Sequence, residues 1–244
     1  FAGMSDARFT DATGGAFLQN FPANATLLYE GDPVDFLYIL LEGTVELQGT
    51  WKDKESTLAI LRPISTFILA AVVLDANALM SARTLEKSQI LMLSAESLRR
   101  TMNEDPAFAV AVAQEVSGCY RGLVRSIKNQ KLRSGAERLA NYLLTLQVRQ
   151  GGVETVTLPH EKRTLASLLG MTAENLSRAF ATLSDYGVEV QGAEVKLARP
   201  VPLRRLAAPS PLLDNHMPPG KGTTGKAAKE MWPPSERSCS AERG

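Results

Sequence analysis

The chain has 244 residues, enough for one large or two ordinary domains at about 100 to 200 residues per domain. Apolar residues make up 44% and charged residues 22%, which excludes a wholly disordered, collagen-like or polytopic membrane chain. The longest apolar run, residues 67–74, is far shorter than the about 20 residues of a membrane span. Two cysteines cannot form a disulfide framework, and residues 1–10 lack the basic patch and apolar core of a secretory leader. A cytoplasmic protein without a membrane partner is therefore expected.

Charge is distributed unevenly along the chain. Residues 1–119 carry 8 Lys and Arg against 15 Asp and Glu, whereas residues 120–205 carry 14 against 7. This asymmetry is typical of a chain in which one module senses a signal and another binds a polyanion. A chance excess of charge on an ordinary solvated surface is the alternative.

Residues 17–104 predict a domain of short β-strands, preceded by a tail over residues 1–16. Apolar segments alternate with turn signals such as Gly31, Asp32 and Pro33. The expected strands cover residues 26–30, 36–43, 44–50, 56–62, 78–86 and 88–94. Strands of this length and spacing indicate a β-roll or jelly roll, so the expected fold class is α+β.

A helix pattern replaces the strand pattern after Ser94. A short helix is expected up to Asn103, and Pro106 opens a long one because proline suits the first helical turn. Within this second helix, residues 105–131, apolar side chains recur at alternating steps of four and three, as in a heptad seam. The seam includes Val116, Tyr120, Leu123 and Ile127. A parallel homodimer is the favoured interpretation, and a helix that packs only on its own roll is the alternative.

Residues 132–206 predict a winged helix-turn-helix domain. The expected elements are a helix over residues 136–148, a strand over 153–159, helices over 160–170 and 172–187 joined through Gly170, and a hairpin over 188–199. A short helix near residues 201–206 follows. The remaining tail, residues 207–244, is rich in proline and glycine, so disorder is predicted after about Ala208.

The second helix of this pair presents side chains that suit base edges. Glu174, Ser177 and Arg178 share one face at helical spacing. Arginine can donate two hydrogen bonds to guanine, glutamate accepts from the cytosine amino group, and serine adapts to either partner. The three residues are therefore predicted to read DNA bases. An exposed ion pair between Glu174 and Arg178 with no further role is the alternative.

Three further residues are expected to bind phosphates of the DNA backbone. Lys162 and Arg163 open the first helix, where they contribute affinity rather than sequence choice. Thr172 suits the N-cap of the second helix, whose positive end attracts a phosphate. Ordinary solvated charge is the alternative for Lys162 and Arg163.

The order of parts over residues 17–206 resembles the cyclic AMP receptor/Fnr (Crp/Fnr) family of bacterial transcription regulators. The segment LLYEGDPVDFLYILLEGTVEL resembles the family's β-roll signature, and GMTAENLSRAFATLSDYG resembles its recognition helix. Glu174, Ser177 and Arg178 match the Glu-x-x-Ser-Arg pattern of the Fnr/Dnr-like branch. The resemblance implies a homodimer that binds double-stranded DNA at palindromes with half-sites close to TTGAT and that contacts RNA polymerase.

The chain departs from the family in the phosphate-binding cassette. Leu69 and Ala70 stand where cyclic-nucleotide binders carry Gly-Glu, and Met80 and Ser81 stand where they carry Arg-Ser. A buried cyclic phosphate would lack its charged partner and its two-bond clamp. Cyclic AMP is therefore disfavoured as the effector.

The same segment is a candidate effector pocket. Its residues are Phe67, Leu69, Ala70, Met80 and Ser81, and a filled core is the favoured alternative to a pocket. The resemblance to nitric-oxide-responsive relatives implies that haem is possible. No axial ligand is evident, because His160 and His216 lie outside the sensor segment, and no metal site is predicted. Cys119, beside the seam, is either a small apolar residue or a redox or metal sensor.

An enzymatic function is not expected. Residues 17–104 contain no histidine, so the usual metal ligands inside a catalytic β-barrel are missing, and the sequence has no Gly-rich phosphate loop or nucleophile elbow. The remaining alternative is a ligand-binding or protein-interaction module that does not read DNA sequence.

Overall fold

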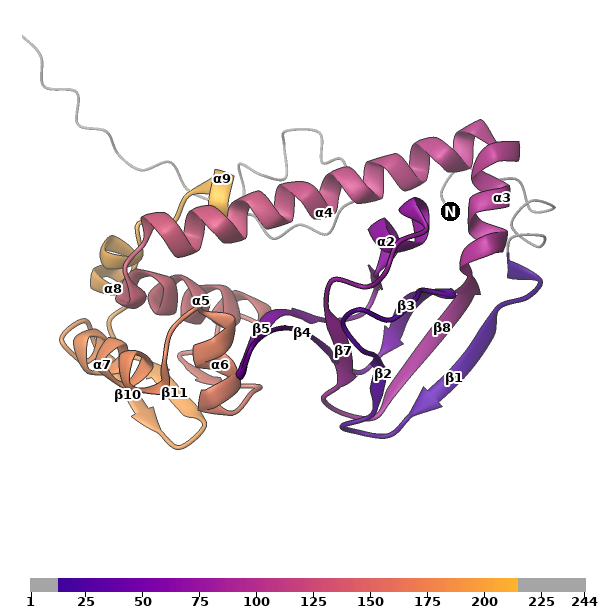
Figure 1. Cartoon of the computed structure of the whole chain (residues 1–244). Helices are drawn as coiled ribbons and strands as arrows, with labels where there is room; N and C mark the ends of the chain where they lie inside the picture. The colour runs from indigo at the N-terminus through magenta and orange to yellow at the C-terminus, as the bar shows by residue number, and fades with distance from the viewer. Residues whose placement is uncertain (1–12, 215–244) are drawn as a thin grey trace, which may run out of the picture.

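The computed structural model describes residues 13–214, which form a β-roll, a long helix and a C-terminal domain (Figure 1). In that part of the chain, the roll consists of two four-stranded antiparallel sheets. One sheet has the order β1 (Phe17–Phe21), β8 (Ser88–Ser94), β3 (Phe36–Glu42), β6 (Ser65–Phe67), and the other β2 (Thr26–Leu28), β7 (Ser81–Thr84), β4 (Val45–Trp51), β5 (Lys54–Leu61). The predicted β-roll and the α+β fold class are confirmed.

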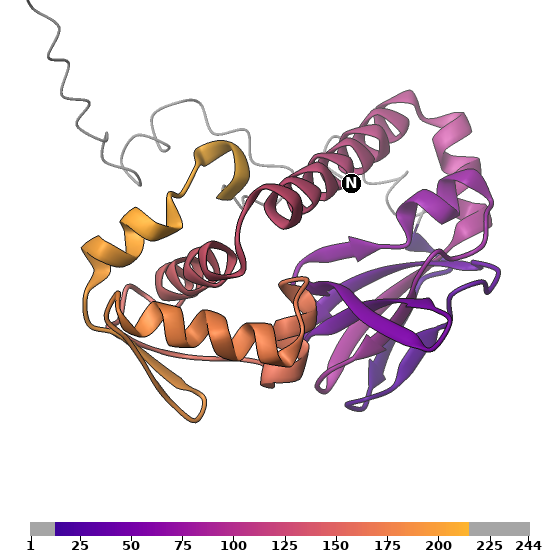
Figure 2. The same cartoon turned by 60° about the vertical axis from the view of Figure 1, so that its left-hand side comes forward.

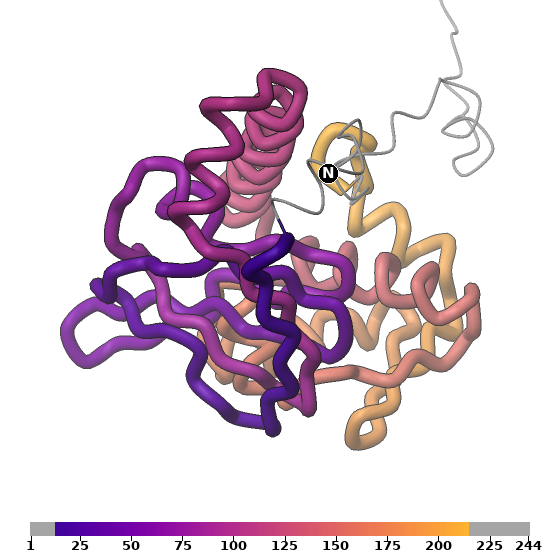
Figure 3. Tube along the Cα trace, turned by 90° about the vertical axis from the view of Figure 1, so that its right-hand side faces the viewer, coloured from indigo at the N-terminus to yellow at the C-terminus, as the bar shows by residue number. Residues whose placement is uncertain are grey.

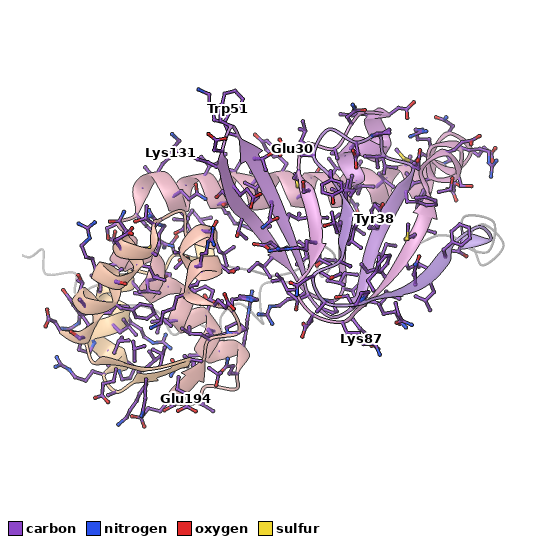
Figure 4. The ribbon with its side chains drawn as sticks, turned by 60° about the horizontal axis from the view of Figure 1, so that its bottom comes forward. Glu30, Tyr38, Trp51, Lys87, Lys131 and Glu194 are labelled. Carbon is purple, nitrogen blue, oxygen red and sulfur yellow. The ribbon has the colours of Figure 1, made fainter. Side chains whose placement is uncertain are left out.

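Apolar side chains from alternate strand positions fill the space between the two sheets. Leu40, Val45 and Ile90 are fully buried there. The ring of Tyr38, inside the roll (Figure 4), stacks on Phe67 with 5.1 Å between ring centroids. Because successive strand residues point to opposite faces, the outward positions are left to contact other parts of the chain.

The sequence prediction missed three elements of the roll. Two are the short strands β1 and β6, and the third is helix α2 (Leu69–Leu74), within the apolar run that precedes β7. A short continuous apolar run does not distinguish a buried strand from a buried helix. Two residues in the left-handed conformation, Ile68 at φ 64° and Asp75 at φ 53°, delimit α2. Side chains rarely adopt this conformation, so local propensity does not predict these ends.

Two helices leave the roll. Helix α3 (Ala95–Glu104) is followed by α4 (Pro106–Leu132), whose N-cap Asp105 accepts hydrogen bonds from the N–H groups of Ala107 and Phe108 at 2.9 and 3.2 Å. Phe108 and Val112 anchor the first turns of α4 in an apolar cluster on the outer face of the roll. Beyond them α4 runs along the length of the molecule to the C-terminal domain (Figure 1).

The C-terminal domain has the predicted winged helix-turn-helix arrangement (Figure 2). Its elements are α5 (Gly135–Arg149), β9 (Thr155–Thr157), α6 (Lys162–Leu168), α7 (Ala173–Ser184), β10 (Val188–Gln191), β11 (Glu194–Leu197) and α8 (Pro200–Ala207). Leu139, Leu143 and Leu165 are fully buried in a core shared by the helices and the sheet β10-β11-β9.

A hinge of two residues, Arg133 and Ser134, separates α4 from α5. Ser134 forms a capping box with Glu137: its hydroxyl accepts from the Glu137 N–H at 3.3 Å, and the Glu137 carboxylate accepts from the Ser134 N–H at 2.6 Å. These hydrogen bonds lower the pKa of Glu137. The reciprocal cap lets α5 begin at its own residues and not as a continuation of α4.

Order persists beyond the position predicted from the sequence. The tail does not lose structure after Ala208, because a short helix, α9 (Pro211–Asp214), follows and lies against α4 (Figures 1 and 2). The rest of the predicted tail, residues 215–244, and residues 1–12 lie outside the described residues.

The roll and the C-terminal domain touch directly beneath α4. Strand β5 is an edge of its sheet and packs against α6. The backbone N–H of Thr57 on β5 donates to the Ser167 hydroxyl on α6 at 2.6 Å. Figure 3 views the molecule from the side of the roll, with the C-terminal domain behind it.

Candidate nucleic-acid interface

Helix α7 has one buried face and one exposed face. Leu176, Ala179 and Leu183 are buried in the domain core, and Phe180 packs against it half-buried. The helix begins after Thr172, whose hydroxyl accepts from the Asn175 N–H at 3.2 Å. Because α7 also packs on α5, its buried face fixes which side chains point outward.

The exposed face carries the three residues predicted to read bases. Glu174, Ser177 and Arg178 are all exposed. The Arg178 guanidinium donates to the Asn175 side-chain oxygen at 2.8 Å. A hydrogen bond from Thr172 lowers the pKa of Glu174, so its carboxylate is ionised at neutral pH. The face thus combines an acceptor, a hydroxyl and a cationic donor, the set that base edges require.

The partner that holds Arg178 was not identified from the sequence. The spacing of four residues suggested an ion pair between Glu174 and Arg178, whereas the guanidinium donates a hydrogen bond to Asn175, three residues away, and its charge contributes to the lowered pKa of Glu174. The spacing of three residues on one helix face was the available signal for this contact.

The predicted phosphate-binding residues lie at the helix N-termini. Lys162 and Arg163 are exposed in the first turn of α6. Thr172 caps α7, so its hydroxyl is engaged by the helix itself. The turn between the helices contains Gly170 at φ 63°, a left-handed conformation that glycine adopts without steric cost.

The wing is the hairpin of β10 and β11. Its turn contains Gly192 at φ 62°, and Glu194 lies at this end of the hairpin, as labelled in Figure 4. Lys196 on β11 forms an exposed ion pair with Glu154 at 3.7 Å.

The predicted seam of α4 forms an apolar strip on the surface. Tyr120, Leu123 and Ile127 are 66%, 59% and 45% exposed, and Val116 is half-buried against the roll. Cys119, next to this strip, is exposed. Tyr120, Leu123 and Ile127 follow one another at steps of three and four residues along one face of α4.

The structure does not bring the five predicted effector-pocket residues together. Phe67 and Met80 belong to the cluster inside the roll, whereas Leu69 packs in the other cluster beneath α3 and α4. Ala70 is exposed, and the Ser81 hydroxyl accepts from the Glu30 N–H at 2.9 Å. The apolar members are divided between two packed clusters because strand β6 and helix α2 point them in different directions.

A hollow of about 440 Å³ lies elsewhere on the roll, and none of those five residues lines it. It lies between the start of β3, the end of α2 and the N-terminus of α3. Arg99 crosses this region, bonding the Asp75 carboxylate and the Val72 carbonyl, each at 3.0 Å.

No group of three or more His, Cys, Asp or Glu side chains within residues 13–214 has the geometry of a metal site. No helix in the same residues is long and apolar enough to cross a membrane.

Comparisons with known proteins agree with this architecture. The cyclic nucleotide-binding domain family matches residues 18–105, and the Crp-like helix-turn-helix domain family matches residues 137–206. The chain is 24% identical to the global nitrogen regulator of a Nostoc species, covering 81% of this chain and 93% of that protein. It is also 24% identical to the CRP-like cAMP-activated global transcriptional regulator of Mycobacterium tuberculosis, covering 77% and 87%.

Solved structures share the fold. FixK2 from Bradyrhizobium japonicum superposes with a TM-score of 0.68 at 21% identity, covering 80% of this chain and 98% of FixK2. Both domain families occur in this chain, one on each side of α4. The chain therefore belongs to the Crp/Fnr family of transcription regulators, which act by binding DNA through the helix-turn-helix domain and not by catalysis.

Proposed function

We propose that the protein is a homodimeric regulator that reads palindromic DNA with TTGAT-like half-sites through Glu174, Ser177 and Arg178. The observation that carries the proposal is the exposed position of these three side chains on a helix whose opposite face is buried. An exposed helix of this kind fits the major groove, where its acceptor and donors meet base edges. Lys162 and Arg163 bind phosphates and fix the register, and the positive end of α7 at Thr172 attracts a third phosphate.

The dimer forms through the strip on α4. Tyr120, Leu123 and Ile127 recur at heptad spacing and lie on a part of α4 beyond its contacts with the roll. Two copies of this strip bury each other in a parallel coiled coil. The two copies of α7 then reach successive major grooves, about 34 Å apart.

We assign one role to each part of the chain. The roll, residues 17–104, is the sensor, the helix over residues 105–131 is the dimerisation element, and residues 132–206 bind DNA. RNA polymerase is the proposed partner at the promoter, as expected for a regulator of this family.

Cyclic AMP is not the proposed effector, although the sensor matches a cyclic nucleotide-binding domain. Leu69 is buried in an apolar cluster and Ala70 carries no charged group, so the ribose has no carboxylate partner at these positions. Met80 provides no guanidinium, and the Ser81 hydroxyl already accepts from the backbone of Glu30. An anionic cyclic phosphate would lose its water without gaining a charged hydrogen-bond partner. Isothermal titration with cyclic AMP should show no binding, whereas micromolar binding would contradict this point.

DNA binding by matched variants tests the proposed function. Fluorescence anisotropy with a TTGAT palindrome and a scrambled duplex, over a range of salt concentrations, gives both affinity and specificity. Arg178→Ala should remove about 1 to 3 kcal/mol of the preference for the palindrome, because the bidentate contact to guanine is lost. Lys162→Ala should weaken binding to both duplexes alike and reduce the salt slope by about 1.

Equal affinity of the wild-type protein for the palindrome and the scrambled duplex at moderate salt would refute sequence-specific recognition. If Arg178→Ala weakened binding to the palindrome and to the scrambled duplex equally, as Lys162→Ala is expected to do, Arg178 would contact only the DNA backbone.

A further inference from the structure

The segment that follows α8 crosses the hinge between the two domains. This segment, residues 209–214, is called the strap below; it contains α9 and lies beside the C-terminal end of α4 (Figure 2). The helix-turn-helix family match ends at residue 206, so the strap lies outside the matched domain.

The strap is held beside the end of α4 by a bidentate, largely buried ion pair. Arg133, the hinge residue that directly follows α4, donates to both carboxylate oxygens of Asp214 at 2.6 and 2.7 Å. The two side chains are only 8% and 17% exposed. Arg125, two turns earlier on α4, donates through Nε to the Leu212 carbonyl at 3.2 Å. The Ser210 N–H donates to Asp214 at 2.6 Å and closes the strap on itself.

The other end of the strap is fixed to the DNA-binding domain. The buried Asn141 side chain on α5 donates to the Ala207 carbonyl at 2.6 Å, which ties the end of α8 to α5. Arg133 also donates to the carbonyl of Ala208 at 3.5 Å. The strap therefore connects α4 on one side of the hinge with α5 and α8 on the other.

We propose that the strap is a positioning element that fixes the angle between α4 and the DNA-binding domain, with Asp214 as its positioning residue. Besides the covalent hinge at Arg133 and Ser134, hydrogen bonds join α4 to that domain through the strap and through Arg138 on α5, which donates to the Gln130 carbonyl on α4 at 3.1 Å. The strap reaches α4 from α8, and an added link beside the covalent connection restricts rotation about it.

The consequence for DNA binding rests on the proposed function. Both copies of α7 must meet one duplex at a fixed spacing, and any freedom at the hinges has to be lost on binding. A strap that restricts the hinge beforehand reduces this loss. Removing the carboxylate would also leave the Arg133 guanidinium, a largely buried charge, without its charged partner.

Full-length variants at one position provide the test. Asp214→Asn removes the charge but keeps the size, Asp214→Glu keeps the charge, and Asp53→Asn removes an exposed acid from the turn between β4 and β5 as a matched control. Hydrogen exchange of the protein without DNA should rise about tenfold at residues 130–141 in Asp214→Asn. Asp214→Glu should recover most of the protection, and Asp53→Asn should match the wild type.

Anisotropy with the TTGAT palindrome supplies the second measurement. Asp214→Asn should bind about tenfold more weakly with an unchanged salt slope, because no phosphate contact is removed. An unchanged exchange rate at residues 130–141 in Asp214→Asn would overturn the proposal. Faster exchange there together with an unchanged affinity for the palindrome would also overturn it. If the wild-type protein itself does not prefer the palindrome, the proposed function fails, and exchange at the hinge then decides whether the strap restrains it.

Discussion

His160 lies half-buried just before α6, close to the contact between the roll and the DNA-binding domain. Burial lowers its pKa, Arg62 lowers it further, and Glu46 and Glu86 act in the opposite direction. The pKa of a histidine in an unfolded chain is about 6.5. His160 therefore takes up its proton at a higher pH in the unfolded chain than in the folded protein. The stability contributed by neutral His160 is complete above that unfolded pKa and is lost as the pH falls through the folded pKa.

A substitution of this residue should therefore change the pH dependence of stability. The thermal midpoint of the wild-type protein should fall between about pH 7 and pH 5, and His160→Gln should reduce the slope of that fall, because glutamine has no proton to gain in this range. Differential scanning fluorimetry in buffers of equal ionic strength measures both slopes. Identical slopes would show that ionisation of His160 is not linked to folding.

Single residues were predicted best where their chemistry is local. The exposed positions of Glu174, Ser177 and Arg178 follow from the helical period, which separates them from the apolar face of α7. The helical period places both Glu174 and Asn175 next to Arg178, so it does not predict that the hydrogen bond forms with Asn175. Glu46 was not singled out at all, although it is 2% exposed and binds both Arg83 at 2.8 Å and Thr57 at 2.6 Å.

Among the elements, α4 has an exposed apolar strip at the positions where the heptad spacing of its sequence predicts one. The alternating steps of four and three predict an apolar seam, and the strip on the surface contains Tyr120, Leu123 and Ile127. Within residues 13–214 these side chains keep 66%, 59% and 45% of their surface exposed. A second copy of α4 is the occupant that the heptad period favours.

The dimer can be tested at the centre of the strip. Leu123→Glu places a charge where two helices would exclude water, so the dimer dissociation constant should rise on the order of a hundredfold. Sedimentation velocity over a concentration series measures the constant, with Lys128→Glu, on another face of α4, as the control. A monomeric wild-type protein, or a mutant that dimerises equally well, would contradict the proposed seam.

Short elements were harder to predict than long ones. The long helix and the helix-turn-helix pair have several periods of apolar side chains, whereas α2 spans only Leu69–Leu74. Its left-handed boundary residues and the division of its neighbours between two clusters arise from packing. For the same reason, the sequence identified the residues around the cassette but not whether they line a common space.

At the scale of the whole molecule, the contact between β5 and α6 joins the β-roll to the DNA-binding domain. The edge strand has backbone groups that no neighbouring strand pairs, and the Ser167 hydroxyl accepts one of them, the Thr57 N–H. Thr57 is buried, and its hydroxyl donates to Glu46, so the contact continues into the sheet through a buried carboxylate.

Removing the Ser167 hydroxyl should loosen this contact. Ser167→Ala leaves the buried Thr57 N–H without its acceptor, which should lower the free energy of unfolding by about 1 to 3 kcal/mol. Urea denaturation measures the stability, and hydrogen exchange should show faster exchange in β5 and α6. Ser184→Ala is the control, because it removes an exposed hydroxyl that donates to the Ala181 carbonyl of its own helix. Equal exchange in β5 for both variants would show that the domains do not depend on this hydrogen bond.

The sequence by itself determined the order of the parts, the exposed face of α7 and the apolar seam of α4, because these depend on periods and turn residues that are close together along the chain. Only the tertiary structure decided that residues 209–214 return to α4, that Ser167 meets Thr57, and that the cassette residues separate into two clusters. Each of these contacts joins residues far apart in sequence. Their geometry depends on how whole elements pack, which no local pattern of side chains specifies.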